Sequence, residues 1–124
     1  MSTGQVAASL HIDSGSTAIL RLDTVCRGSV TVITVSGELD LSTVHLLDEI
    51  IGHLVQERPA RVVLDTADVT FFCADGLRAL IRARDAVAAA GGQLMLRNPS
   101  PAALRVFTIT QTAHLFELDD GAAG

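Results

Sequence analysis

The side chains with the clearest chemical potential in this chain are carboxylates, and five of them lie in or next to the loops predicted after strands: Glu38, Asp40, Asp65, Asp68 and Asp75. Grouped carboxylates can hold a divalent cation or accept a phosphoryl group. A phosphoryl receiver of the response-regulator kind also needs a lysine, and all nine basic residues here are arginine. The absence of lysine also excludes a Walker-type phosphate loop and Schiff-base chemistry.

The four histidines offer no partner for these carboxylates that would make a catalytic group. His45 is close to Asp40 in sequence, but a histidine at the start of a helix is ordinarily a plain polar residue. Cys73 as a nucleophile is the weakest hypothesis, because no histidine base follows it nearby. We therefore expect no metal site, no cofactor and no enzymatic activity. The histidines stand at positions 11, 45, 53 and 114.

Composition narrows the remaining classes of function. The chain has 124 residues, 48% of them hydrophobic, with a net charge of −5 and 3% aromatic residues. A nucleic-acid-binding protein needs a basic face or a stacking platform, so this composition excludes one. The longest stretch without a charged residue, 1–12, is shorter than the roughly 20 apolar residues of a membrane span. We expect one domain without signal peptide or membrane contact, located in the cytoplasm, whose two cysteines are reduced thiols.

Two end segments enclose a region of alternating strand and helix patterns. Residues 1–17 and 119–124 are small, polar or acidic and aperiodic, which predicts flexible tails. The folded region, 18–118, opens with β-rich runs over 19–25 and 30–35. The turn residues between the runs, Arg27, Gly28 and Ser29, indicate a hairpin.

Apolar residues then recur at steps of three and four from Ser42 to Leu54, which predicts the first helix. Ser42 suits the N-cap position, and Leu41 is placed to pack against Leu46 as a hydrophobic staple. The continuous apolar run at 61–65 is typical of a parallel strand covered by helices.

The second half repeats the alternation. A helix is predicted from near Gly76 to the glycine pair at 91–92, followed by a strand over 93–97. Ser100 and Pro101 form an N-cap and first-turn pair that starts a third helix. A last strand is predicted over 115–118. The order ββαβαβαβ predicts an α/β fold whose sheet is mostly parallel, with an antiparallel first strand at one edge and packed helices.

Ligands and partners of such sheets meet the loops at the carboxyl ends of the parallel strands. These loops are predicted at 36–42, 65–76 and 98–100, and they contain the five carboxylates. We therefore expect an acidic edge. Taken singly, each carboxylate is explained as a helix cap or a solvated turn residue.

Four runs in order and spacing carry a family resemblance: GELD at 37–40, RVVLD at 61–65, VTFFCADGL at 69–77 and GQLMLRNP at 92–99. From about residue 18 to residue 118 the chain resembles the STAS domain, and in particular the stand-alone bacterial anti-sigma factor antagonists. The resemblance implies a single STAS-type domain that is not an enzyme. Such a protein binds an anti-sigma factor, itself a serine kinase, and so frees the sigma factor. The kinase phosphorylates the antagonist on a serine at the start of the second helix, which breaks the complex.

The position that matches this serine is Ala74, which has no hydroxyl. Phosphorylation at the usual site is therefore impossible, and we expect an antagonist that stays competent to bind. In the family, a helix N-terminus tolerates the phosphate within the antagonist, while its added charge repels the partner. The resemblance implies a partner-binding surface made of Asp40, Ser42, Thr43, Thr70, Cys73, Ala74, Asp75, Gly76, Leu77 and Arg78.

Two residues of this surface allow more than one interpretation. Asp75 is either a plain N-cap or a permanent negative charge, which would be a poor mimic of phosphate. Cys73 is either a small half-buried side chain or a redox switch, since the start of a helix favours a thiolate. A Cys26–Cys73 disulfide requires α-carbons within about 7 Å of each other.

Three further questions stay open. Arg78, Arg82 and Arg84 form a row on the second helix that is either solvated or faces acid on a partner. A homo-dimer is possible. The alternative function is a small-ligand or redox sensor, or a scaffold module in a larger signalling assembly.

Overall fold

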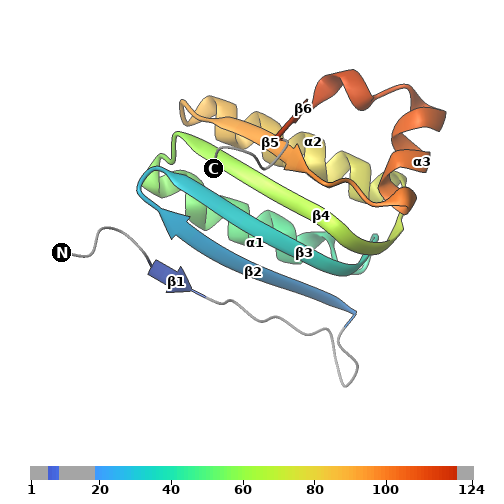
Figure 1. The fold of residues 1–124 in the computed structure, drawn as a ribbon, viewed down its shortest axis with the longest axis horizontal. Helices are drawn as coiled ribbons and strands as arrows, with labels where there is room; N and C mark the ends of the chain where they lie inside the picture. The colour runs from blue at the N-terminus through green and yellow to red at the C-terminus, as the bar shows by residue number, and fades with distance from the viewer. Residues whose placement is uncertain (1–5, 9–18, 120–124) are drawn as a thin grey trace.

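The computed structural model describes residues 6–8 and 19–119. It confirms the predicted α/β order and adds one short strand before it (Figure 1). The strands are β1 Val6–Ala8, β2 Leu20–Arg27, β3 Val30–Leu39, β4 Arg61–Phe72, β5 Gln93–Arg97 and β6 Glu117–Leu118. The helices are α1 Val44–Leu54, α2 Ala74–Ala89 and α3 Pro101–Thr110, with the short 3₁₀ turns η1 Val55–Glu57 and η2 Ala113–Leu115.

The strands form one sheet in the order β1-β2-β3-β4-β5-β6. The β1–β2 and β2–β3 pairs are antiparallel and the other three are parallel, as predicted for a mostly parallel sheet with an antiparallel edge. The predicted hairpin turns at Gly28, whose φ of 60° is a conformation that glycine adopts without strain.

The prediction of flexible tails is wrong at two places. Val6–Ala8 form β1 and pair with residues 24–26 of β2, because the exposed edge of a hairpin offers free backbone groups to a further strand. Asp119 is also anchored, since its backbone N–H donates to the Leu96 carbonyl at 2.7 Å and its carboxylate pairs with Arg97 at 2.6 Å. The predicted tail residues 1–5, 9–17 and 120–124 lie outside the described part of the chain.

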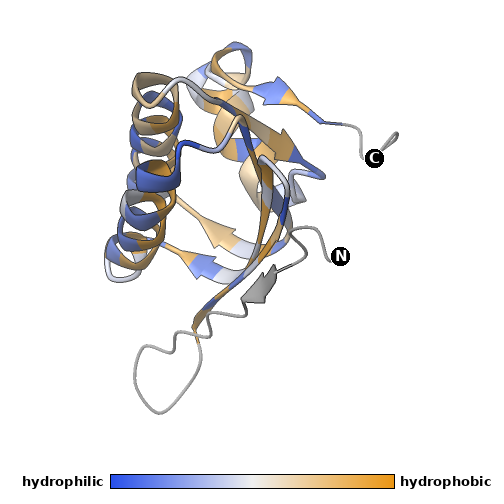
Figure 2. Ribbon diagram, turned by 90° about the vertical axis from the view of Figure 1, so that its left-hand side faces the viewer, coloured by the Kyte–Doolittle hydropathy of each residue, from blue (hydrophilic) through white to orange (hydrophobic). Residues whose placement is uncertain are grey.

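The two long helices cover one face of the sheet, and no helix of residues 6–8 and 19–119 lies on the opposite face (Figure 2). Alternate residues of β2, β3, β4 and β5 face these helices, for example Leu22, Ile33 and Leu64, which are fully buried. Complete burial of one such side chain stabilises the fold by about 1.5–3 kcal/mol. Among the described residues, no helix is both long and apolar enough to cross a membrane.

Strand β4 is longer than predicted, and this is the main correction to the elements. The loop predicted at 65–76 is strand as far as Phe72, which leaves Cys73 alone between β4 and α2. Register shifts between β3 and β4 mark two irregularities along this extension, and Asp65 bridges the first by accepting from the Ala67 N–H at 3.1 Å. These bulges break the two-residue alternation that identifies a strand in sequence.

The predicted N-cap is confirmed for α3 and wrong for α1. Ser100 caps α3 as predicted, accepting from the Ala103 N–H at 3.1 Å, with Pro101 in the first turn. In α1 the N-cap is Thr43 rather than Ser42. Leu41 is 72% exposed and forms no staple, because the helix begins after a turn that carries Leu41 outward.

Candidate functional site

The candidate site lies where β3 and β4 end side by side. These parallel neighbours reach their last paired residues, Leu39 and Phe72, in register. Asp40 and Cys73 therefore emerge next to each other, although they are far apart in sequence. The Cys73 thiol lies 4.0 Å from the Leu39 carbonyl oxygen. Helix α2 begins directly at this point, so the Asp40 turn and the α2 N-terminus form one surface.

Asp40 organises the turn that leads into α1. Its carboxylate Oδ1 accepts from the Ser42 hydroxyl at 2.7 Å and from the Ser42 N–H at 2.9 Å. Its own N–H donates to the Thr43 hydroxyl at 3.0 Å, which in turn donates to the Glu38 carbonyl at 2.8 Å. The hydrogen bond from the Ser42 side chain is the largest cause that lowers the pKa of Asp40 below its ordinary value. Asp40 is thus a fixed negative charge at neutral pH.

The first turn of α2 carries the residues of greatest functional interest. Cys73 is the N-cap with extended backbone, and its side chain forms no capping hydrogen bond. Ala74 is the first helical residue and is exposed. Asp75 is the second, so the N-cap interpretation of Asp75 is wrong. Its carboxylate instead pairs with Arg78 at 2.7 Å, one turn along the helix.

Close packing fixes the position of this helix start. A Cβ on Gly76 would lie 2.7 Å from the Leu39 carbonyl oxygen and 3.0 Å from the Phe72 ring. Such approaches require glycine, because a backbone carbonyl cannot move aside as the end of a flexible side chain can. Gly76 therefore holds the α2 N-terminus directly against the ends of both strands.

The predicted binding residues divide by exposure into two groups. Thr43 is completely buried, and Gly76 and Leu77 are buried beneath the helix start, so these three shape the surface from below and do not form it. The residues that reach solvent, fully or in part, are Asp40, Ser42, Thr70, Cys73, Ala74, Asp75 and Arg78.

Two apolar residues belong to this surface and were missed in the sequence. Leu41 is 72% exposed in the Asp40 turn, and Phe71 is 49% exposed at the end of β4. Phe71 is exposed because only one of two consecutive strand residues can face the core, and Phe72 does so by packing against Phe107; the sequence did not show this, since the segment was predicted to be a loop. For Leu41 the sequence carried no signal of exposure either. Single exposed apolar side chains are common on protein surfaces, and here two of them lie beside the polar groups at the strand ends.

The arginine row of α2 is paired within the chain. Arg82 forms a two-pronged ion pair with Asp48 of α1, with distances of 2.9 and 3.2 Å. Arg84 contacts Asp85 at 2.9 Å and the Leu115 carbonyl at 3.1 Å. Only Arg78 lies at the candidate surface, so the row as a whole fastens α2 to its neighbours.

The predicted acidic edge is smaller than expected. Glu38, Asp40 and Asp75 lie around the strand ends, whereas Asp65 pairs in register with Thr34. Asp65 is therefore about 16 Å from the end of β3, at about 3.3 Å per residue. Within residues 6–8 and 19–119, no three His, Cys, Asp or Glu side chains are grouped to hold a metal ion.

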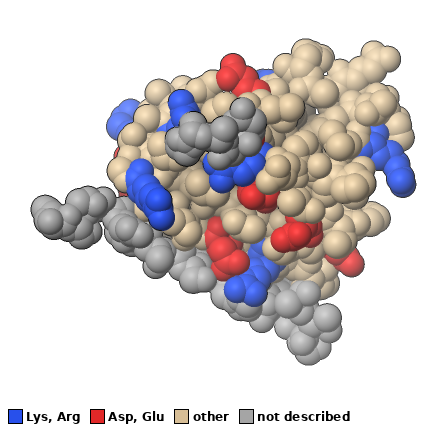
Figure 3. Space-filling view, in the orientation of Figure 1, with Lys and Arg blue, Asp and Glu red and all other residues tan. Residues whose placement is uncertain are grey.

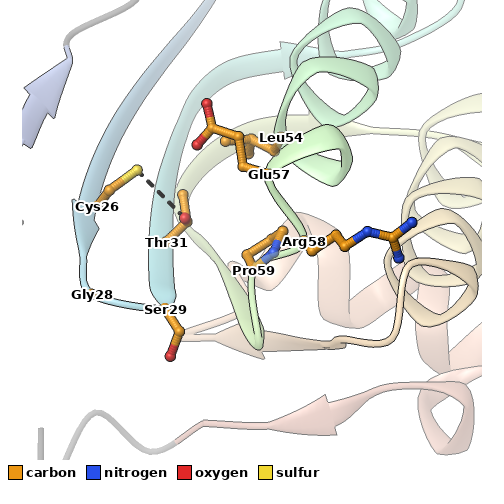
Figure 4. A pocket seen from close by; sticks show the side chains of 8 residues that line it. All are labelled: Cys26, Gly28, Ser29, Thr31, Leu54, Glu57, Arg58 and Pro59. Atoms are coloured by element: carbon orange, nitrogen blue, oxygen red, sulfur yellow. Dashed lines mark hydrogen bonds between the residues drawn. The ribbon is translucent and has the colours of Figure 1, made fainter.

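Cys26 lies at the opposite end of the sheet from Cys73. It pairs in register with Thr31, eight residues before Leu39, which puts the two cysteines about 26 Å apart. An intramolecular disulfide between them is therefore impossible. Cys26 lines a cavity of about 230 Å³, with its sulfur 3.4 Å from the Thr31 hydroxyl (Figure 4). In Figure 4 the Arg58 side chain points away from this cavity.

Comparison with known proteins identifies the fold. The STAS domain profile matches residues 21–122. The anti-sigma-F factor antagonist RsfB of Mycobacterium tuberculosis is 39% identical over 51 residues, which is 41% of this chain and 42% of RsfB. The aligned segment thus spans less than half of that relative.

Two solved structures share the fold over most of their length. An anti-sigma factor antagonist from Mycobacterium paratuberculosis superimposes with a TM-score of 0.73 at 24% identity, covering 90% of this chain and 92% of that one. The antagonist SpoIIAA in its unphosphorylated form gives a TM-score of 0.67 at 20% identity, covering 82% of this chain and 89% of SpoIIAA. Because the domain profile spans nearly the whole chain and the architecture agrees, this protein belongs to the STAS domain family.

Proposed function

We propose that this protein is an anti-sigma factor antagonist: a non-enzymatic, cytoplasmic protein that binds an anti-sigma factor of the serine-kinase type and so frees its sigma factor. The observation that carries the proposal is the joining of the Asp40 turn and the α2 N-terminus into one surface. The exposed apolar residues Leu41 and Phe71 beside it supply the buried contact area that a protein partner needs. The likeness to RsfB supports the same class of partner.

Binding is proposed to be independent of phosphorylation at the start of α2. Ala74 occupies the exposed first helical position, where a kinase would need a hydroxyl. Asp75 is a weak substitute for phosphate, because it carries one charge and shares it with Arg78 at 2.7 Å. The surface is therefore permanently in its binding state.

We propose that any redox control acts through modification of Cys73 alone, without a disulfide to Cys26. Cys73 is half-buried at the centre of the surface and cannot reach Cys26. A covalent adduct on its sulfur would place new bulk between the antagonist and its partner. Capture of the partner with and without reductant, repeated with Cys73→Ser, tests this: an effect of reductant that persists in the variant excludes Cys73.

The small-ligand alternative gains no support from the Cys26 cavity. Its volume of about 230 Å³ is below the range of roughly 300–1,000 Å³ typical of ligand pockets. A thermal shift series with nucleotides discriminates the two functions. A ligand at one hundred times its Kd would add about 2.7 kcal/mol to the free energy of unfolding, and we expect no shift.

The test is capture of partners from a lysate of the source cells, followed by identification and by direct binding of the purified partner. We expect an anti-sigma factor with a kinase domain. Phe71→Asp, which puts a charge into the apolar part of the surface, should weaken that binding at least tenfold. Arg105→Glu is the matched control, because this exposed α3 residue forms no ion pair among the described residues. Equal binding of both variants would place the interface elsewhere.

A further inference from the structure

Strand β4 ends in two neighbouring phenylalanines, and only one of them faces the core. Phe72 is 7% exposed and belongs to the core beneath the helices, whereas Phe71 is 49% exposed. On a regular strand the side chains alternate between the two faces, so residues an even number of positions apart face the same side. The register of β4 must therefore select which of the two rings is presented to solvent.

The core positions of β4 depart from even spacing twice. Leu64, Val69 and Phe72 all belong to the core, although the steps between them are odd. Strand β3 keeps the regular spacing, since Val35 and Leu39 are both buried at an even step. Each odd step requires an extra residue on β4, and the pairing with β3 shifts at both places. Two bulges on β4 therefore reverse its alternation and then restore it.

Thr70 is the extra residue of the second bulge. Val69 pairs with Gly37, and Phe71 pairs with the next residue of β3, Glu38, so the register passes over Thr70. The exposed Thr70 side chain closes the bulge, because its hydroxyl donates to the Gly37 carbonyl at 3.3 Å. This bond joins the bulged residue of β4 directly to the neighbouring strand.

The bulge decides which ring is exposed. Without it, alternation from Val69 onward would place Phe71 in the core and turn Phe72 outward. Both registers bury one phenylalanine ring, so apolar burial alone distinguishes them weakly. The Thr70 bond to Gly37 belongs to the bulged register, and it therefore favours the arrangement in which Phe71 points outward.

We propose that Thr70 is a positioning residue for partner binding: its bond to Gly37 holds the Phe71 ring outward, where the ring enters an apolar pocket of the partner. This inference rests on the proposed function, in which the surface beside Asp40 binds the anti-sigma factor. An aromatic side chain in a partner's pocket commonly supplies much of the binding energy. The right side of Figure 3, where β3 and β4 end in the view of Figure 1, is largely uncharged, as an apolar contact requires.

The position of the ring can be measured in the chain alone. The sequence contains no Trp and no Tyr, so Phe71→Tyr introduces a single tyrosine with a ring of the same size. Acrylamide should quench its fluorescence strongly, because the ring is exposed. Adding Thr70→Val, which replaces the hydroxyl by a methyl group, should lower this quenching, whereas adding Thr70→Ser should leave it unchanged. Thr108→Val is the matched control, because it removes an exposed hydroxyl that donates to the Leu104 carbonyl at 2.8 Å.

Binding to the captured anti-sigma factor supplies the second readout. Thr70→Val should weaken it about twofold to tenfold, the range expected for the loss of one hydrogen bond, and Thr70→Ser should restore it. Thr108→Val should leave it unaltered. In a chain that already carries Phe71→Ala, Thr70→Val should have no further effect, because the ring that Thr70 positions is gone. A full effect in that background would overturn the proposal, since Thr70 would then contact the partner itself.

The two readouts separate this inference from the proposed function. If no anti-sigma factor is captured, the proposed function fails, while the quenching series still decides whether Thr70 positions the ring. Equal quenching of F71Y and of the double variant T70V/F71Y would overturn the positioning role, whichever partner is found.

Discussion

Two helices of this protein, α2 and α3, follow strands of the same sheet, but their first turns are built differently. At α3, Ser100 is buried and its hydroxyl accepts from the Ala103 N–H at 3.1 Å. At α2, Cys73 occupies the same position but its side chain makes no capping hydrogen bond, and the next residue, Ala74, is exposed. The α3 start is completed within the fold. The first backbone N–H groups of α2 receive no hydrogen bond from a capping side chain.

The helix starts also differ in what holds them in place. The α2 start depends on contact with the ends of β3 and β4 through Gly76, whereas the α3 start depends on its own cap. Stability at α2 is thus provided by packing beneath the surface. This leaves the exposed residues free to serve binding.

The largest effect on stability is expected from a substitution at Gly76. Gly76→Ala would place a Cβ 2.7 Å from the Leu39 carbonyl oxygen and should lower the free energy of unfolding by about 1–3 kcal/mol. Gly52→Ala in α1 is the matched control, since a Cβ there meets nothing within 4 Å. That control should raise the free energy of unfolding by about 0.5–1 kcal/mol. Urea denaturation measures both, and equal effects would contradict the packing argument.

The two N-caps provide the next comparison. Ser100→Ala removes the side-chain bond to Ala103 and should cost about 1 kcal/mol. Cys73→Ala should change stability by less than about 0.5 kcal/mol, because no capping bond is lost. Cys73→Ser should add about 0.5–1 kcal/mol by supplying the missing cap. Thermal unfolding of the three variants measures these changes in the free energy of unfolding. A loss of stability in Cys73→Ala as large as that in Ser100→Ala would show that the Cys73 side chain does cap α2.

A smaller effect is expected from the ion pair between the helices. Arg82→Ala removes the contact with Asp48 and should cost about 0.2–1 kcal/mol, since both side chains are exposed. Arg105→Ala should be neutral by comparison. If Arg82→Ala left stability unchanged in low salt while weakening partner binding, the arginine row would belong to the interface.

The smallest effect is expected in the pH dependence of stability, through the carboxylate of Asp40. Its pKa is lowered in the fold, chiefly by the Ser42 hydroxyl, so the ionised form stabilises the native turn. This contribution is present above the pKa of an unfolded aspartate, about 3.9, and is lost as the pH falls through the lower folded value. Asp40→Asn should therefore lower stability at pH 7 and leave it nearly unchanged at pH 2. Melting curves at the two pH values measure this, and an equal loss at both would assign the effect to packing.

The sequence predicted the alternation of strands and helices and the pairing of the Asp40 turn with the start of α2. Periodicity, the Ser100–Pro101 pair and the glycines after α2 indicate the alternation locally, whereas the pairing of the Asp40 turn with α2 was implied by the strand order and the family resemblance. It did not predict the extension of β4 to Phe72, because bulges near Asp65 and Thr70 hide the alternation. It also placed Thr43 on the surface, whereas Thr43 is completely buried and its hydroxyl donates to the Glu38 carbonyl.

The central claim is that the α2 N-terminus is the partner-binding surface and that Ala74 keeps it in the binding state. The most direct measurement is binding of the captured kinase-type anti-sigma factor to the natural chain and to Ala74→Ser, each with and without ATP. We expect the natural chain to bind equally in both conditions. Ala74→Ser should gain phosphate and lose binding only when ATP is present. Loss of binding by the natural chain with ATP, or phosphorylated Ala74→Ser that still binds, would contradict the account.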